Sequence, residues 1–118
     1  MRTILFVCTG NTCRSSMAEA IFKDLIKDLD NMKDIRVLSA GTWAIPGQKA
    51  SQNAIEVMKE RNIDLESHNS TPLTEELVKE ADLILTMTRN HKAQILSVLP
   101  ELKDKVYTLK EFVEDEAG

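Results

Sequence analysis

The hydrophobic residues of this chain fall into short continuous runs separated by amphipathic stretches. The runs lie at 4–7, 35–39, 82–87 and 105–108, and they are short enough for strands covered on both faces. After the first run, apolar residues recur every three to four positions, at Ala18, Ile21, Phe22, Leu25, Ile26 and Leu29. A strand–helix–strand order implies parallel strands joined by right-handed crossovers. The pattern predicts an α/β fold, a three-layer sandwich with a four-stranded parallel sheet and helices on both faces.

Hydroxyl residues mark where two further helices begin. Ser51 opens a helix of about three turns, and Thr74 opens a short one. The first is expected to bury Ala54, Ile55, Val57 and Met58. Another helix is predicted over residues 89–99, with His91 and Lys92 in solvent.

Composition and charge narrow the class of protein. A chain of 118 residues is long enough for one domain, spanning 1–118. The net charge of −4, with basic residues spread along the chain, argues against a nucleic-acid partner. No run approaches about 18 consecutive apolar residues, and no signal peptide opens the chain, so no membrane partner and a cytoplasmic location are expected.

The segment after the first strand carries the candidate chemistry. Cys8 stands at the carboxyl end of that strand, where open α/β sheets bind ligands. The loop from Thr9 to Ser15 then leads into a helix, so its N–H groups can surround one anion. Gly10 and Asn11 are the loop residues that best tolerate a positive φ. This pattern predicts a site for a tetrahedral oxyanion.

The spacing of Cys8 and Arg14 assigns each a role in that site. N–H groups, a helix dipole and a guanidinium all favour a thiolate, which makes Cys8 a candidate nucleophile. Arg14 can grip two phosphoryl oxygens at once, and Ser15 can donate a hydrogen bond to the sulfur. The alternative is a buried strand-end cysteine followed by a surface arginine. The strand before, the Gly-Asn pair within and the helix after favour the catalytic interpretation.

The run VCTGNTCRS at 7–15, followed by MAEA at 17–20, resembles the low-molecular-weight protein tyrosine phosphatase family. Thr12 makes the loop more similar to the bacterial protein-arginine-phosphatase branch than to the tyrosine-directed branch, and the likeness runs from Ile4 to about Val113. The resemblance implies a phosphoprotein phosphatase that forms a phosphocysteine and needs no cofactor and no metal. Its partners would be phosphoarginine or phosphotyrosine side chains of proteins, with inorganic phosphate as product or inhibitor.

The resemblance also assigns roles to individual residues. The phosphate-binding residues would be Thr9, Gly10, Asn11, Thr12, Cys13, Arg14 and Ser15. Ser39 and His68 would support Asn11, and Trp43 would wall the substrate cleft. The residues themselves leave other readings open: Ser39 as a turn cap, Trp43 as a packing anchor and His68 as a surface residue. Cys13 either resolves an oxidised Cys8 as a disulfide or packs within the loop.

The end of the chain departs from the family pattern. Relatives continue into an Asp-Pro loop, whose aspartate is the general acid, and a final helix, whereas no Asp-Pro pair occurs here. We therefore expect a truncated domain with impaired turnover and an uncovered apolar face through which copies could associate. A non-catalytic phosphate-binding module is the main alternative. An arsenate reductase is disfavoured because no cysteine follows Cys13.

Overall fold

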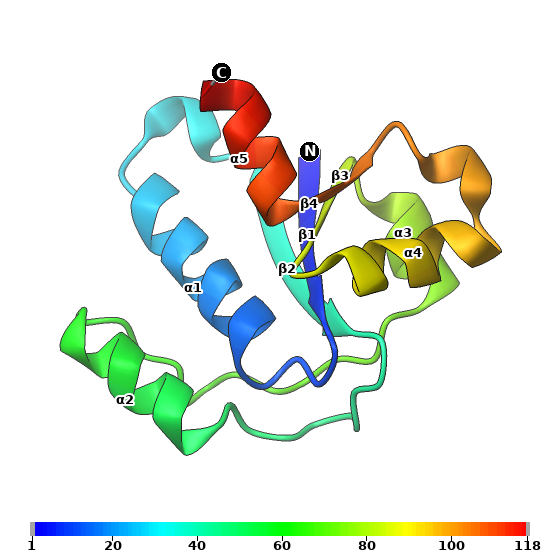
Figure 1. The fold of residues 1–118 in the computed structure, drawn as a ribbon. Helices are drawn as coiled ribbons and strands as arrows, with labels where there is room; N and C mark the ends of the chain where they lie inside the picture. The colour runs from blue at the N-terminus through cyan, green and yellow to red at the C-terminus, as the bar shows by residue number, and fades with distance from the viewer. Residues whose placement is uncertain (1, 118) are drawn as a thin grey trace.

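The computed structural model describes the backbone of residues 2–117 and the side chains of residues 2–114. Its four strands are β1 (Arg2–Cys8), β2 (Ile35–Gly41), β3 (Leu83–Thr86) and β4 (Val106–Thr108). They form one parallel sheet in the order β2-β1-β3-β4 (Figure 1). The predicted four-stranded parallel sheet is confirmed, with strand ends shifted by one or two residues.

The helices are α1 (Arg14–Ile26), α2 (Gln52–Glu60), α3 (Glu75–Glu80), α4 (Arg89–Val98) and α5 (Leu109–Ala117), with short 3-10 turns at Asp30–Met32 and Pro100–Leu102. Ser51 and Thr74 cap α2 and α3 as predicted, each accepting a hydrogen bond from a backbone N–H. No helix within residues 2–117 has the length and apolar character needed to cross a bilayer.

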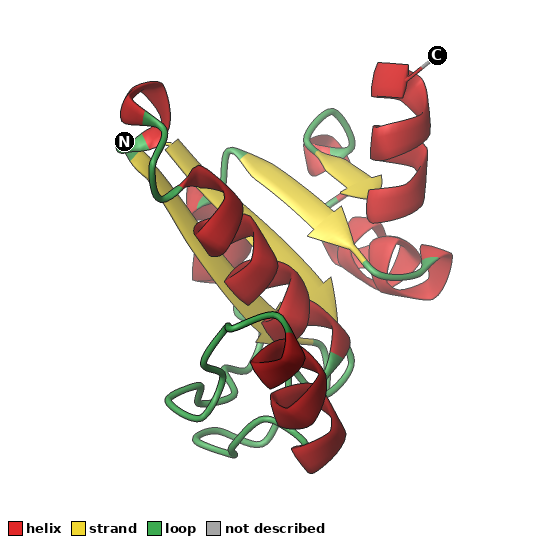
Figure 2. Cartoon of the chain, turned by 90° about the vertical axis from the view of Figure 1, so that its left-hand side faces the viewer, coloured by secondary structure: helices red, strands yellow, loops and turns green. Residues whose placement is uncertain are grey.

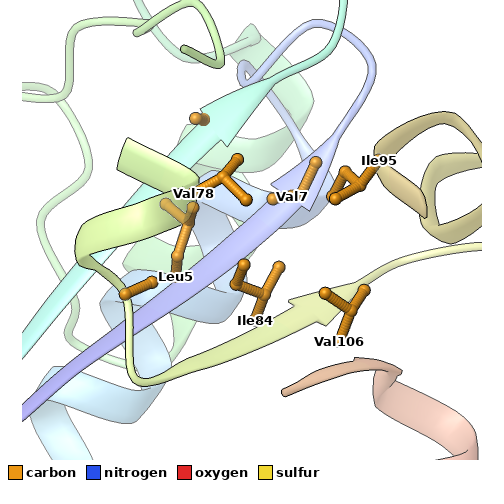
Figure 3. Packing of buried hydrophobic residues seen from close by; sticks show 8 residues of the cluster. Leu5, Val7, Val78, Ile84, Ile95 and Val106 are labelled. Carbon is orange, nitrogen blue, oxygen red and sulfur yellow. The ribbon is translucent and has the colours of Figure 1, made fainter. Parts of the chain in front are cut away.

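Alternation along β1 divides the core between two faces of the sheet. Leu5 and Val7 point to the face that α3 and α4 cover, where they meet Val78, Ile95 and Val106 (Figure 3). Phe6 points to the opposite face, which α1 and α5 cover (Figure 2). Met58 of α2 packs on α1 rather than on the sheet. The three-layer arrangement confirms the predicted fold class.

Some residues expected to face the core do not. Leu25 is 68 % exposed and Val57 is 47 % exposed. Both line an apolar groove of about 520 Å³ between α1, α2 and the start of α5. The helical period therefore identified an apolar stripe, but part of that stripe faces a groove instead of the sheet. The expectation that copies of the chain associate through an apolar face stays a prediction.

Candidate active site

The loop between β1 and α1, residues 9–13, lies at the carboxyl edge of the sheet (Figure 1). Cys8 is the last residue of β1 and is 4 % exposed. Arg14 is the first residue of α1, so the loop runs directly into a helix N-terminus, where N–H groups favour an anion. The predicted position of the anion-binding loop agrees with this geometry.

The Cys8 sulfur lies among hydrogen-bond donors. Ser15 Oγ is 2.8 Å from Cys8 Sγ, and the Asn11 backbone N–H donates to the same sulfur at 3.3 Å. The Asn11 N–H is a donor and the Ser15 hydroxyl can be one, so the sulfur lies against groups able to stabilise a negative charge.

Asn11 determines the shape of the loop. Its φ is 58°, in the left-handed region, and the residue is fully buried. Its side-chain N–H groups donate to Ser15 Oγ (2.9 Å) and Ser39 Oγ (2.8 Å), while its Oδ1 accepts from the Thr71 N–H (2.8 Å). These bonds hold a conformation that asparagine otherwise adopts at a cost. Gly10, the other loop residue that tolerates a positive φ, does not adopt one.

A chain of hydrogen bonds leads from Glu19 to the sulfur and sets the direction of each donor. The Glu19 carboxylate can only accept, so the Ser39 hydroxyl donates to it. Ser39 Oγ then accepts from Asn11, whose other N–H donates to Ser15. Ser15 accepts from Asn11 and keeps its own proton, which it donates to the sulfur when Cys8 is a thiolate, because a thiolate can only accept. The sequence did not single out Glu19, whose partner lies 20 residues away.

His68 supports the loop through the backbone of Asn11. Its Nε2 lies 2.6 Å from the Asn11 carbonyl oxygen, which can only accept, so this ring nitrogen is the donor. The contacts of Ser39 and His68 with Asn11 are those that the family resemblance implied.

Backbone contacts from the β2 side hold the rest of the loop. The Thr42 N–H donates to the Cys8 carbonyl and the Trp43 N–H to the Thr9 carbonyl, both at 2.9 Å. A Cβ on Gly41 would lie 2.3 Å from the Thr9 carbonyl oxygen, so only glycine fits at this position. Sequence reasoning missed Gly41, and a glycine ending a strand was its only signal.

An open cleft of about 580 Å³ begins at the loop, a volume typical of ligand sites. Thr9, Arg14 and Trp43 line it together with residues of α3 and α4. Trp43 is 84 % exposed, which contradicts the packing-anchor alternative and agrees with a cleft wall. Among the described residues that line the cleft, Glu75 alone carries a carboxylate, and it pairs with Lys79 at 3.0 Å.

The expectation that His91 and Lys92 lie in solvent is wrong. His91 is 4 % exposed, and its ring nitrogens lie 2.9 Å from Thr9 Oγ1 and 2.9 Å from Thr88 Oγ1. Burial, and then the nearby Arg14 charge, lower the pKa of His91 below its ordinary value. The Lys92 ammonium pairs with Glu111. The short turn that ends β3 brings this face of α4 against the loop, which periodicity within α4 could not reveal.

The remaining loop residues differ in exposure. Cys13 is an exposed free thiol, whereas Cys8 is a buried one, and Thr12 is partly buried. The Thr12 carbonyl accepts from the Ser51 N–H at 2.7 Å, which ties the loop to the start of α2. A disulfide-forming role for Cys13 stays a prediction. In the described part of the chain, no three His, Cys, Asp or Glu residues gather as a metal site.

Known proteins with similar sequences and structures agree with the family resemblance of the loop. Residues 3–118 match the sequence model of a family described as low molecular weight phosphotyrosine protein phosphatase. A protein-arginine-phosphatase of Bacillus subtilis is 50 % identical over 115 residues, which cover 98 % of this chain and 75 % of that protein. A probable low molecular weight protein-tyrosine-phosphatase, EpsP of Ralstonia nicotianae, is 40 % identical and covers 94 % and 72 %. The structure of a YwlE arginine phosphatase mutant, a cysteine-to-serine variant with a phosphorylated active-site serine, superposes with a TM-score of 0.86 at 50 % identity, covering 94 % and 71 %.

Proposed function

Because the chain belongs to the low molecular weight phosphotyrosine protein phosphatase family, we propose that it removes phosphoryl groups from protein side chains through a phosphocysteine on Cys8. The observation that carries this proposal is the set of polar groups around the Cys8 sulfur. Ser15 and the Asn11 N–H both face Cys8 Sγ, at the start of a helix whose first residue is Arg14. A thiolate held in this way can act as a nucleophile toward phosphorus.

The reaction would proceed in two steps. The Cys8 thiolate attacks phosphorus and an S–P bond forms, while the bond from phosphorus to the substrate nitrogen or oxygen breaks and its electron pair stays with that atom, which takes a proton from solvent. The loop N–H groups and Arg14 hold the three equatorial oxygens through the transition state. Water then attacks the phosphocysteine, which releases inorganic phosphate and returns the thiolate to its bond from Ser15. The phosphorylated active-site serine of the YwlE variant supports an enzyme-bound phosphoryl group in a relative.

Phosphoarginine is the substrate class that we favour over phosphotyrosine. Thr12 offers a small side chain with a hydroxyl, which leaves room for a guanidinium-derived group, whereas a large aliphatic residue would pack on a phenyl ring. The relative at 50 % identity is named a protein-arginine-phosphatase, and the relative at 40 % identity is named a protein-tyrosine-phosphatase. The expected test is Thr12→Val, which keeps the shape and removes the hydroxyl. It should reduce kcat/KM for a phosphoarginine peptide about fivefold or more relative to p-nitrophenyl phosphate, the size of one lost hydrogen bond.

We also propose that these 118 residues do not supply the general acid. No Asp-Pro pair occurs among them, and Glu75 in the cleft is 58 % exposed and paired with Lys79. A missing acid slows expulsion of a poor leaving group by about 10²–10⁴-fold. Breaking a P–N bond requires a proton on nitrogen, so phosphoarginine should suffer more than p-nitrophenyl phosphate. Equal turnover of both substrates by the 118-residue chain would contradict this.

A phosphate-binding module that does not turn over is the second candidate, favoured by the same lack of an acid. Incubation with p-nitrophenyl phosphate, followed by mass spectrometry of the intact chain and of Cys8→Ser, distinguishes the two. Nitrophenol release beyond one equivalent, absent in Cys8→Ser, supports the enzyme. A single equivalent with a phosphocysteine that persists for minutes supports the module. An unmodified chain without release contradicts the enzyme, and the module is contradicted as well if that chain does not bind inorganic phosphate.

The free thiols of Cys8 and Cys13 fit a reducing compartment, so we place this activity in the cytoplasm.

A further inference from the structure

His91 is a buried titratable group that the reaction above does not use. It lies in the first turn of α4, and its Nε2 is 2.9 Å from the hydroxyl of Thr9, the residue that follows Cys8. Its Nδ1 is 2.9 Å from Thr88 Oγ1, and Thr88 caps α4 by accepting the His91 backbone N–H. The imidazole therefore links the first residue of the phosphate loop to the turn after β3.

This link completes the support of Thr9. On the β2 side, the Trp43 N–H holds the Thr9 carbonyl at 2.9 Å. On the β3 side, the exposed Thr9 side chain has His91 as its hydrogen-bond partner among the residues whose side chains are described. With both in place, the backbone of Thr9 has little freedom to rotate, so the N–H groups at the start of the loop keep one direction.

The environment of His91 suits a neutral ring. Burial and the Arg14 charge lower its pKa, and each hydroxyl partner can donate or accept, so a neutral imidazole has both nitrogens satisfied. The other charged groups nearby are Glu75, which lines the same cleft, and Arg89 and Lys92, which flank His91 on α4.

We infer that His91 is a positioning residue for the phosphoryl group, which it affects by holding the Thr9 hydroxyl and with it the start of the phosphate loop. This inference rests on the proposed function. Its effect should fall on binding rather than on the chemical step, because His91 touches the loop and not the reacting sulfur. One hydrogen bond of ordinary strength corresponds to a change of about two- to twelvefold in a binding constant.

The test removes the hydrogen bond between His91 and Thr9 by changing each partner in turn. His91→Leu and Thr9→Val should each raise KM for p-nitrophenyl phosphate and Kd for inorganic phosphate by about two- to twelvefold, with kcat within about twofold. The double variant should be no worse than the more affected single variant, because both remove one bond. His91→Gln, whose amide can still donate near the position of Nε2, should recover most of the loss.

A second readout follows the ring itself. A phosphate bound beside Arg14 offsets the positive charge that disfavours protonated His91, so phosphate should raise the pKa of His91 measured by NMR. By linkage, phosphate should bind more tightly where His91 becomes protonated. A histidine with a purely structural role far from the anion would show no such coupling.

Val106→Ala is the matched control, since Val106 is fully buried in β4 and its loss costs stability without touching the loop. A wild-type chain that neither binds phosphate nor hydrolyses the ester refutes the proposed function and this inference with it. A working wild type refutes the inference alone if KM and Kd stay unchanged in both single variants, if the two effects add, or if Val106→Ala reproduces them. If His91→Leu does not fold, His91→Gln and Thr9→Val decide between these outcomes.

Discussion

Replacing Ser15 with alanine tests the chain of hydrogen bonds that ends at the sulfur. Ser15 is fully buried, lies 2.8 Å from Cys8 Sγ, and accepts from Asn11 at 2.9 Å. Since an ionised sulfur can only accept, the Ser15 hydroxyl donates to the Cys8 thiolate while its oxygen accepts from Asn11. Ser15→Ala therefore removes a donor to the thiolate and leaves one buried Asn11 N–H without its partner.

The magnitude follows from the kind of bond that is lost. A hydrogen bond to a charged group contributes about 1.5–3 kcal/mol. At about 1.4 kcal/mol per factor of ten, loss of this bond should slow alkylation of Cys8 by about 10- to 100-fold. The unpaired Asn11 N–H should in addition lower the free energy of unfolding by about 1–3 kcal/mol.

Iodoacetamide alkylation of Cys8, followed by mass spectrometry at pH 5–8, measures the thiolate directly, and urea unfolding measures stability. Ser16→Ala is the matched control. Ser16 is equally buried in the next position, and its hydroxyl donates to the Cys13 carbonyl, which keeps its helical bond from the Met17 N–H. An alkylation profile that is the same for Ser15→Ala, Ser16→Ala and wild type would show that Ser15 does not donate to the sulfur.

Substitutions at Asn11, Gly41 and His91 probe the shape and the protonation of the site. Asn11→Gly adopts the positive φ without strain but loses the side-chain bonds. Asn11→Ala loses the same bonds and is also strained at this φ, so its free energy of unfolding should be about 1 kcal/mol lower than that of Asn11→Gly. Equal values in urea unfolding would show that the left-handed backbone carries no cost. Gly41→Ala should abolish phosphate binding in an NMR titration, because the new Cβ meets the Thr9 carbonyl oxygen. Gly47→Ala is the control: Gly47 has a φ of 77° with open space around its Cβ position, so this change should lower the free energy of unfolding by about 1–2 kcal/mol and leave binding intact. Burial and Arg14 lower the pKa of folded His91 below 6.5, so its neutral ring favours the fold fully above pH 6.5 and progressively less as the pH falls below that value. Urea unfolding of wild type and His91→Gln should therefore converge on going from pH 7.5 to pH 5.5, and a constant difference would contradict this.

The sequence by itself determined the architecture and the local part of the site. Continuous apolar runs located the strands, and the order of elements implied a parallel sheet, because these properties depend on neighbours in the chain. The Cys8–Arg14 spacing worked for the same reason, since one loop and one helix start contain the whole motif. The position of the anion loop at the carboxyl end of β1 therefore follows from the sequence alone.

The tertiary structure decided which distant residues complete the site. His91 meets Thr9 across 82 positions, and Gly41 meets it across the β1–β2 pair, so no local period could reveal either contact. Exposure was likewise decided by packing: Leu25 belongs to an apolar stripe of α1, yet it borders a groove. A hydrophobic pattern records which residues avoid water, whereas the assembled layers determine which surface each of them meets.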